Sequence, residues 1–423
     1  MPVAPLDITL PLPDSTTARR ALGQYLKYTA RLLTQIPMGR FQAPVFDAFA
    51  DARAQLTALL RGESAGLAYR CLRRPSVSVL IRCLHRELWG DGDVRRLDAL
   101  LGELTALIWF ELAVAHQLPT GGVKLTLPRP RLAVACLEVE LSLHPDARLG
   151  LRDGQLVVEL GEQAHLIELE QLAAIGAGAE NPHAAPAEGA VALSVRRTHF
   201  PICGEIHLVT TDNNPLALEE AHPDKQGNAL DLGGREPEAW QAAVAEAYAL
   251  IDAHYPELAA EMQLVMHAYH PVGYDAERHL SASYAEAVGT AYLSLHPDVM
   301  TLAEALIHEF SHNKLNALIA TSPILNNGYG QLVTSPVRPD PRPLHGVLLA
   351  VHAFVPVAEL YRRLKQAQAP VATTPDFERR YQAIIQKDLD GIQTLREHAE
   401  PTELGERCLA ELYAWAAEHA PAA

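Results

Sequence analysis

The stretch that most constrains this chain is residues 299–319, which follow a proline-containing break and read as one long helix. His308 and His312 lie four residues apart within it, so their rings project from one face, about one turn apart. Neutral imidazoles placed in this way can share one cation, such as zinc, iron, nickel or copper. Glu309 lies about 100° around the helix from His308, close enough to touch a metal-bound water or to orient a ligand. The sequence therefore predicts a metal-binding helix.

Two histidines do not complete a catalytic site, which usually has three protein ligands and an open position. Leu318 stands where the metzincin continuation would place a third histidine, so that family is excluded. No glutamate occurs between Glu309 and Glu359, so the spacing of a gluzincin is also missing. The third ligand must come from another part of the chain.

The first strong downstream candidates lie in a proline-rich segment, residues 335–348. We favour His345, because it falls in the first turn of a predicted helix and a proline-stiffened approach loses little entropy on binding. Asp340 is the alternative and would give a site of two histidines and one carboxylate. His352 is a further candidate, although a core histidine with satisfied hydrogen bonds is the simpler interpretation.

Two arginines, Arg338 and Arg342, stand between prolines in the same segment. Surface arginines usually contact only solvent and have no specific ligand. A guanidinium held beside a metal ligand, however, can bind a carboxylate through two hydrogen bonds. A 2-oxoacid cosubstrate needs this arrangement, since one end chelates the metal while the other carboxylate pairs with a cation. We therefore assign cosubstrate binding to one of these arginines, without choosing between them.

The bulk composition narrows the class of protein. With 423 residues and 48% hydrophobic residues, the chain is expected to fold into two or three lobes with real cores. Its net charge of −16 argues against nucleic acid or an anionic membrane surface as a partner. Five scattered cysteines favour reduced thiols over a disulfide framework, and no signal peptide or membrane-length apolar run is recognised. We expect a cytoplasmic protein.

The hydrophobic pattern predicts an α+β fold in three consecutive segments. Residues 1–125 form a helical scaffold or docking lobe, 126–190 a β-rich segment that ends in an Ala/Gly/Pro linker, and 191–423 a mainly helical catalytic domain. The alternation over 132–143 indicates a strand, and 148–160 a hairpin that turns at 152–155. Further helices are expected at residues 45–60, 97–118, 236–254, 342–364, 377–396 and 403–418, and further strands at 192–197, 205–211 and 289–295.

Two sequence blocks carry a family resemblance. The block HEFSHNKL (308–315), followed by SPVRPDPRPLHGVL (335–348), resembles the HExxH-motif proteins found in gene clusters for ribosomally made, modified peptides. The likeness is densest from about residue 281 to 359 and is weaker over most of the remaining chain. Val337 departs from the aromatic residue expected there, and Leu349 and Val351 depart from small or polar ones, which could reshape the substrate pocket.

The resemblance implies an iron(II)- and 2-oxoglutarate-dependent dioxygenase that uses O₂ to hydroxylate the β-carbon of a residue in a precursor peptide. It implies His308, His312 and His345 as iron ligands, and Arg338 or Arg342 as the partner of the 2-oxoglutarate carboxylate. Glu309 would then be a ligand, an orienting residue or a proton relay. The polar clusters at 212–214 and 281–283 read as turns or caps that could line the pocket.

Two other functions compete with this one. The first is a zinc metallopeptidase in which Glu309 activates a metal-bound water as general base. The second is a peptide-binding scaffold in which the metal is only a structural staple. The missing peptidase spacings and the arginines beside His345 favour the dioxygenase.

Overall fold

The structure is a computed structural model that describes residues 7–41, 43–88, 90, 93–184, 192–219, 221–222, 225–330, 332–334 and 341–420. Its contacts group the chain into two compact units. The first contains Met1–Tyr25, Pro201–Ile206 and Asp231–Ala423, and the second contains Leu26–Phe200 and His207–Leu230. The grouping is discontinuous along the chain, because the first described residues pack with the C-terminal helices. The consecutive division at residues 125 and 190 stays a prediction.

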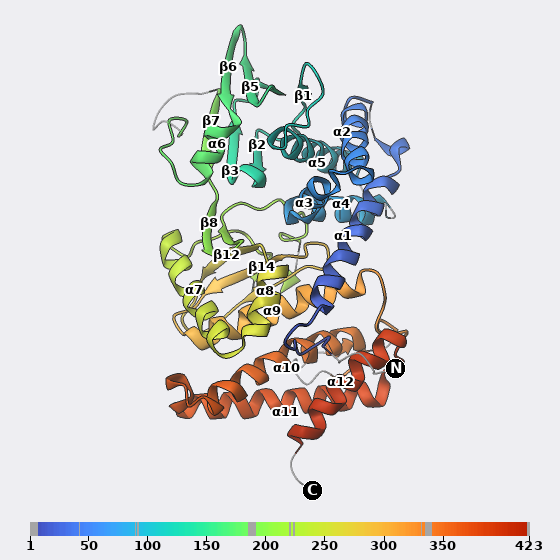
Figure 1. Cartoon of the computed structure of the whole chain (residues 1–423), viewed down its shortest axis with the longest axis vertical. Coiled ribbons are helices and arrows are strands. Elements are labelled where there is room, and N and C mark those ends of the chain that lie inside the picture. Colours follow the sequence, from blue (N-terminus) through green and yellow to red (C-terminus); the bar gives the residue numbers. More distant parts are fainter. Residues whose placement is uncertain are drawn as a thin grey trace. The chain divides into compact units, whose positions relative to one another are not determined.

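The helices of the first unit surround the predicted metal-binding segment, which is helix α9 (Val299–Ile319). Figure 1 shows α10 (Leu344–Gln366) between α9 and α11 (Pro375–His398), and the contacts of α10 with both helices agree. The remaining helices of this unit are α7 (Pro237–His254), α8 (Pro256–Val265), α12 (Glu403–His419), the short η3 (Pro370–Thr373) and the first half of α1 (Thr17–Gln35).

A mixed sheet supplies the strand that leads into α9. Its order is β13 (Ser281–Ala282), β14 (Thr290–Leu295), β12 (Ala268–Tyr274), β9 (Ile206–Val209) and β8 (His199–Cys203). Strands β12 and β14 are parallel, while β13 runs antiparallel to β14. Every residue of β14 is buried, including the polar Thr290 and Ser294, so the strand lies inside the unit. A small antiparallel pair, β15 (Leu332–Val333) and β16 (Arg342–Pro343), precedes α10.

The start of α9 is fixed by a cap. The carboxylate of Asp298 accepts a hydrogen bond of 2.8 Å from the backbone N–H of Thr301, which satisfies one of the free donors at the helix N-terminus. The helix is then buried on almost all sides, with fourteen of its residues inaccessible or nearly so. A helix of this kind is a core element and not a surface helix.

The second unit combines helices with two small antiparallel sheets. The helices are the second half of α1, η1 (Met38–Arg40), α2 (Ala43–Arg61), α3 (Ala65–Arg73), α4 (Pro75–Leu88), α5 (Val94–Val114), η2 (Ala135–Leu137) and α6 (Leu169–Gly176). One sheet has the order β1 (Val123–Leu125), β4 (Arg148–Arg152), β5 (Gln155–Leu160), β6 (Gln163–Glu168). The other has the order β2 (Arg131–Val134), β3 (Val139–Leu143), β7 (Leu193–Arg197), and a short pair joins β10 (Ala221–His222) to β11 (Lys225–Gln226).

The expected α+β class is confirmed: twelve α-helices and several small sheets occur in the described part of the chain. The predicted hairpin is present, and Asp153 and Gly154 have the positive φ angles of 51° and 80° that a tight turn needs. The alternating pattern over 132–143 corresponds to two strands, β2 and β3. Glu138 has a φ of 60°, and the chain turns there between β2 and β3. Residues 185–190 of the expected linker lie outside the described residues.

Helix α10 is the one described helix that is long and apolar enough to cross a membrane. However, 78% of its most apolar window is buried inside the protein, as in the core helix of a soluble protein.

Candidate metal centre

The two motif histidines converge. The Nε2 atoms of His308 and His312 are 2.9 Å apart, and their rings meet edge to face with centroids 4.4 Å apart. Two metal–nitrogen bonds of about 2.1 Å at a right angle would place two nitrogens about 3.0 Å apart. The pair therefore has the spacing that one shared cation requires.

Both histidines are held in the neutral form that binds metals. Burial, followed by the positive charges of His312, His279 and Arg380, lowers the pKa of His308 well below its ordinary value. Burial and then His345 lower the pKa of His312 to about 4. At neutral pH a cation would not have to displace protons from either ring.

The Nδ1 atom of each ring lacks, within the described part of the chain, the hydrogen bond that usually supports a metal-bound histidine. The Nδ1 atoms of His308 and His312 are buried and have no hydrogen-bond partner among the described residues. Metal-bound histidines usually donate this N–H to a carboxylate or carbonyl group, which fixes the tautomer. The side chain that packs on His308 is the ring of Phe354 from α10, with ring centroids 4.7 Å apart, so this edge of the site is apolar.

Glu309 is buried beside the pair and is oriented by a serine. The hydroxyl of Ser281, on strand β13, donates a hydrogen bond of 2.6 Å to Glu309 Oε1, and the glutamate is only 2% exposed. The sequence indicated Ser281 only as part of a polar cluster. Its role becomes visible because β13 pairs with β14, the strand that enters α9.

Asn313 fixes α9 to the sheet. Its Oδ1 accepts a 2.6 Å hydrogen bond from Gly289 N, and its Nδ2 donates to the carbonyls of Thr290 at 3.0 Å and Glu309 at 2.8 Å. The residue is completely buried, so each bond replaces water that cannot reach these groups. Asn313 directly follows His312 but was not among the site residues expected from the sequence.

One turn before His308, Glu304 ties α9 to two further helices. Tyr361 of α10 donates a hydrogen bond of 2.6 Å to Glu304 Oε1, and Arg380 of α11 approaches both carboxylate oxygens, with Nε at 3.1 Å from each. The hydrogen bond to Glu304 raises the pKa of the Arg380 guanidinium above its usual range. This triad fixes the direction in which the His308 face of α9 points.

His345 lies at the start of α10, as expected from the sequence, but it does not complete the pair in this structure. The backbone N–H of His345 donates a hydrogen bond of 2.9 Å to Gly328 O. The His345 ring packs on the ring of Tyr329, with ring centroids 4.8 Å apart. Across the described residues, no three His, Cys, Asp or Glu side chains form a group that could hold a metal ion.

The remaining predicted residues are only partly described. Arg342 lies in β16, half-buried, where it pairs with Val333. Arg338 and Asp340 lie outside the described residues. His352 is fully buried, and its Nε2 donates to Ile8 O at 3.2 Å, so this nitrogen already has a protein partner.

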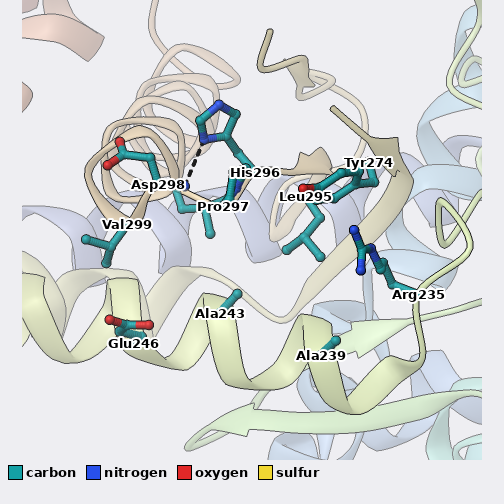
Figure 2. A pocket seen from close by; sticks show the side chains of 11 residues that line it. Arg235, Ala239, Ala243, Glu246, Tyr274, Leu295, His296, Pro297, Asp298 and Val299 are labelled. Atoms are coloured by element: carbon teal, nitrogen blue, oxygen red, sulfur yellow. Dashed lines mark hydrogen bonds between the residues drawn. The ribbon is translucent and has the colours of Figure 1, made fainter. Parts of the chain in front are cut away.

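A cavity of about 440 Å³ opens at the other end of α9 and is separate from the histidine pair. Figure 2 shows that it lies over Ala239 and Ala243 of α7, with Arg235 and Glu246 toward its two ends. The guanidinium of Arg235 lies 4.3 Å from the ring of Tyr274. None of the motif residues lines this cavity, so it does not extend the candidate metal centre.

Comparison with protein-family models gives no match, and comparison with curated proteins gives none either.

Proposed function

We propose that this chain is an iron(II)- and 2-oxoglutarate-dependent dioxygenase that hydroxylates the β-carbon of a residue in a ribosomally made precursor peptide, in the cytoplasm. The observation that carries the proposal is the convergence of the His308 and His312 Nε2 atoms, which lie 2.9 Å apart in two rings whose pKa values are lowered by burial. The resemblance of the 308–315 and 335–348 blocks to the HExxH-motif family supplies the reaction class.

In this proposal His308 and His312 hold the iron, and His345 is the third ligand. To reach the pair, the His345 side chain would have to leave the ring of Tyr329, on which it packs in this structure. Arg338 or Arg342 pairs with the distal carboxylate of 2-oxoglutarate. When bound, iron(II) with 2-oxoglutarate and O₂ supplies the oxidising power that converts a C–H bond into C–OH, with release of CO₂ and succinate.

The chain's own residues would bind and orient the reactants and would exclude water from the site. Phe354 covers His308 with an apolar ring, which limits the access of water to that side of the site. Ser281 holds Glu309 by the hydrogen bond to Oε1, so the carboxylate is an oriented group beside the pair. We assign Glu309 a positioning role, in which it orients a ligand of the iron.

A zinc metallopeptidase is the second candidate, and the position of Glu309 favours it. A buried carboxylate that directly follows a metal-binding histidine is also what a water-activating general base requires. The absent peptidase spacings, and the arginines of the 335–342 segment, argue for the dioxygenase.

One experiment separates these functions. The protein is loaded anaerobically with iron(II), mixed with 2-oxoglutarate and the peptide encoded beside its gene, and then exposed to O₂. A gain of one oxygen atom by the peptide, with stoichiometric succinate, supports the dioxygenase, and His312→Ala must abolish both signals. Peptide fragments formed without 2-oxoglutarate would establish the peptidase instead.

The same assay tests the individual assignments. His345→Ala is expected to lower iron affinity strongly, and full affinity in this variant would refute His345 as a ligand. Arg338→Met and Arg342→Met are compared for the cosubstrate concentration that gives half of the maximal rate. The arginine that pairs with the carboxylate is the one whose loss raises this concentration.

A further inference from the structure

A buried strap, residues Asp7–Leu10, lies among the C-terminal helices of the first unit. Three consecutive backbone amides, those of Ile8, Thr9 and Leu10, donate hydrogen bonds of 3.0, 3.0 and 2.8 Å to the carboxylate of Glu411 on α12. Ile8 and Thr9 are 2% and 1% exposed, so these bonds form without competition from water. The strap is therefore an internal element of this unit.

The carbonyl groups of the strap bind the two helices that carry the candidate iron ligands. Asp7 O accepts a hydrogen bond of 3.2 Å from Lys314 Nζ on α9. Ile8 O accepts one of 3.2 Å from His352 Nε2 on α10. Through these two bonds, the strap joins α9 directly to α10.

Lys314 is the centre of this arrangement. Its ammonium is 2.7 Å from Glu261 Oε2 on α8, and both side chains are almost fully buried. Ser15 donates a hydrogen bond of 2.5 Å to Asp7, and its hydroxyl oxygen lies 3.2 Å from Glu261 Oε1, while Thr17 also donates to Asp7. Burying such a pair costs desolvation energy that its attraction barely repays, so stability alone is a weak reason for its presence.

The position of Lys314 connects this network to the candidate metal centre. It follows His312 by two residues on α9, and His352 follows His345 by seven residues, two turns, on α10. Because the strap bonds to both Lys314 and His352, it links the helix that carries His312 to the helix that carries His345. A displacement of Lys314 therefore moves His312 relative to α10.

We propose that Lys314 is a positioning residue for the His308–His312 pair, and that it acts through Glu261 and the strap to set the distance between α9 and α10. Ligand atoms must be held within about 0.5 Å for a productive site, and supporting groups set this tolerance. The inference rests on the proposed metal site, but it concerns metal affinity and does not depend on which reaction the metal supports.

The test compares cobalt(II) binding by the full chain and by Lys314→Met, with affinity measured by competition against a chromophoric chelator. Loss of a supporting interaction typically lowers metal affinity by about 10–100-fold, and we expect a loss in this range together with a changed cobalt absorption spectrum. Lys314→Arg keeps the charge and should recover most of the affinity. Arg363→Met is the matched control, since it breaks a 2.9 Å ion pair between α10 and Glu257 of α8 but does not touch the strap.

Wild-type affinity and spectrum in Lys314→Met would overturn the proposal, as would an equal loss of affinity in the Arg363→Met control. If Lys314→Met does not fold, Glu411→Gln loosens the strap from the opposite side, and unchanged cobalt binding in that variant overturns the proposal too. A wild-type protein that binds cobalt but hydroxylates no peptide would refute the proposed reaction and leave this inference standing. A wild-type protein that binds no divalent metal would refute both.

Discussion

Asp388 of α11 is the buried acid whose replacement should change stability most clearly with pH. It is 2% exposed, its Oδ2 has no hydrogen-bond partner among the described residues, and burial raises the pKa of its carboxyl well above the ordinary value. In the unfolded chain an aspartate ionises at about pH 3.9, while the folded state keeps the proton to a higher pH. The folded state thus binds more protons, so stability falls as pH rises from the unfolded pKa to the folded pKa.

Asp388→Asn keeps the shape of the side chain and removes the titration. Below about pH 4 the two proteins should be similarly stable, because the aspartate is then neutral in both states. Above that pH the variant should gain on the wild type by up to about 1.4 kcal/mol per pH unit, until the folded pKa is reached. This gain in the free energy of unfolding equals the stability that the wild type loses by burying a carboxyl group whose Oδ2 has no hydrogen-bond partner among the described residues.

Native-state hydrogen exchange of the α11 amides is the appropriate assay, because it reports the opening of this helix by itself in a chain that contains two compact units. The wild type and the variant are compared at each pH between 5 and 8, so intrinsic exchange rates cancel. Asp390→Asn, on the exposed face of the same helix, is the control and should show no pH-dependent difference. A constant difference between the wild type and Asp388→Asn over this range would refute the argument.

Three further predictions concern the site and its supports. Because the pKa of His312 is lowered to about 4, cobalt(II) affinity should stay level from pH 8 down to about pH 5; a decline centred near pH 6.5 would contradict this. Asn313→Ala leaves the buried amide of Gly289 without its partner, and chemical denaturation should show a loss of about 2–4 kcal/mol. Gly405→Ala would place a Cβ atom 2.0 Å from Ile324 O, and chemical denaturation should show a loss of about 1–3 kcal/mol in the free energy of unfolding. An unchanged denaturation midpoint would contradict this and would mean that the start of α12 can shift to admit the methyl group.

Local signals in the sequence predicted local structure well. Residues 299–319 were expected as one helix and form α9 with the same bounds, because a proline break and a capping aspartate mark its start. The 148–160 hairpin followed from Asp153-Gly154, a pair that adopts positive φ angles readily. The turn at Glu138 was missed, because an alternating apolar pattern continues across it and no glycine marks the turn.

The candidate site was predictable only where its partners are close in sequence. The spacing of His308 and His312 fixes their convergence through helix geometry alone. The bond from Ser281 to Glu309 depends on strand pairing between residues far apart in the chain, so no periodicity could indicate it. The bond from Lys314 to Asp7 spans 307 positions and depends on the same long-range packing.

Helix α9 keeps its place through groups that belong to the protein. Asn313 holds it to the sheet, Lys314 to the strap and Glu304 to α10 and α11, and none of these bonds involves a metal ion. Small zinc domains behave differently, because they are unfolded without their ion. We therefore expect that a chelator can remove a bound cation, and that another divalent ion can replace it, without unfolding the chain. The metal content of a purified sample would then reflect the ions present during purification. The metal that supports activity would have to be identified by exchange and reconstitution.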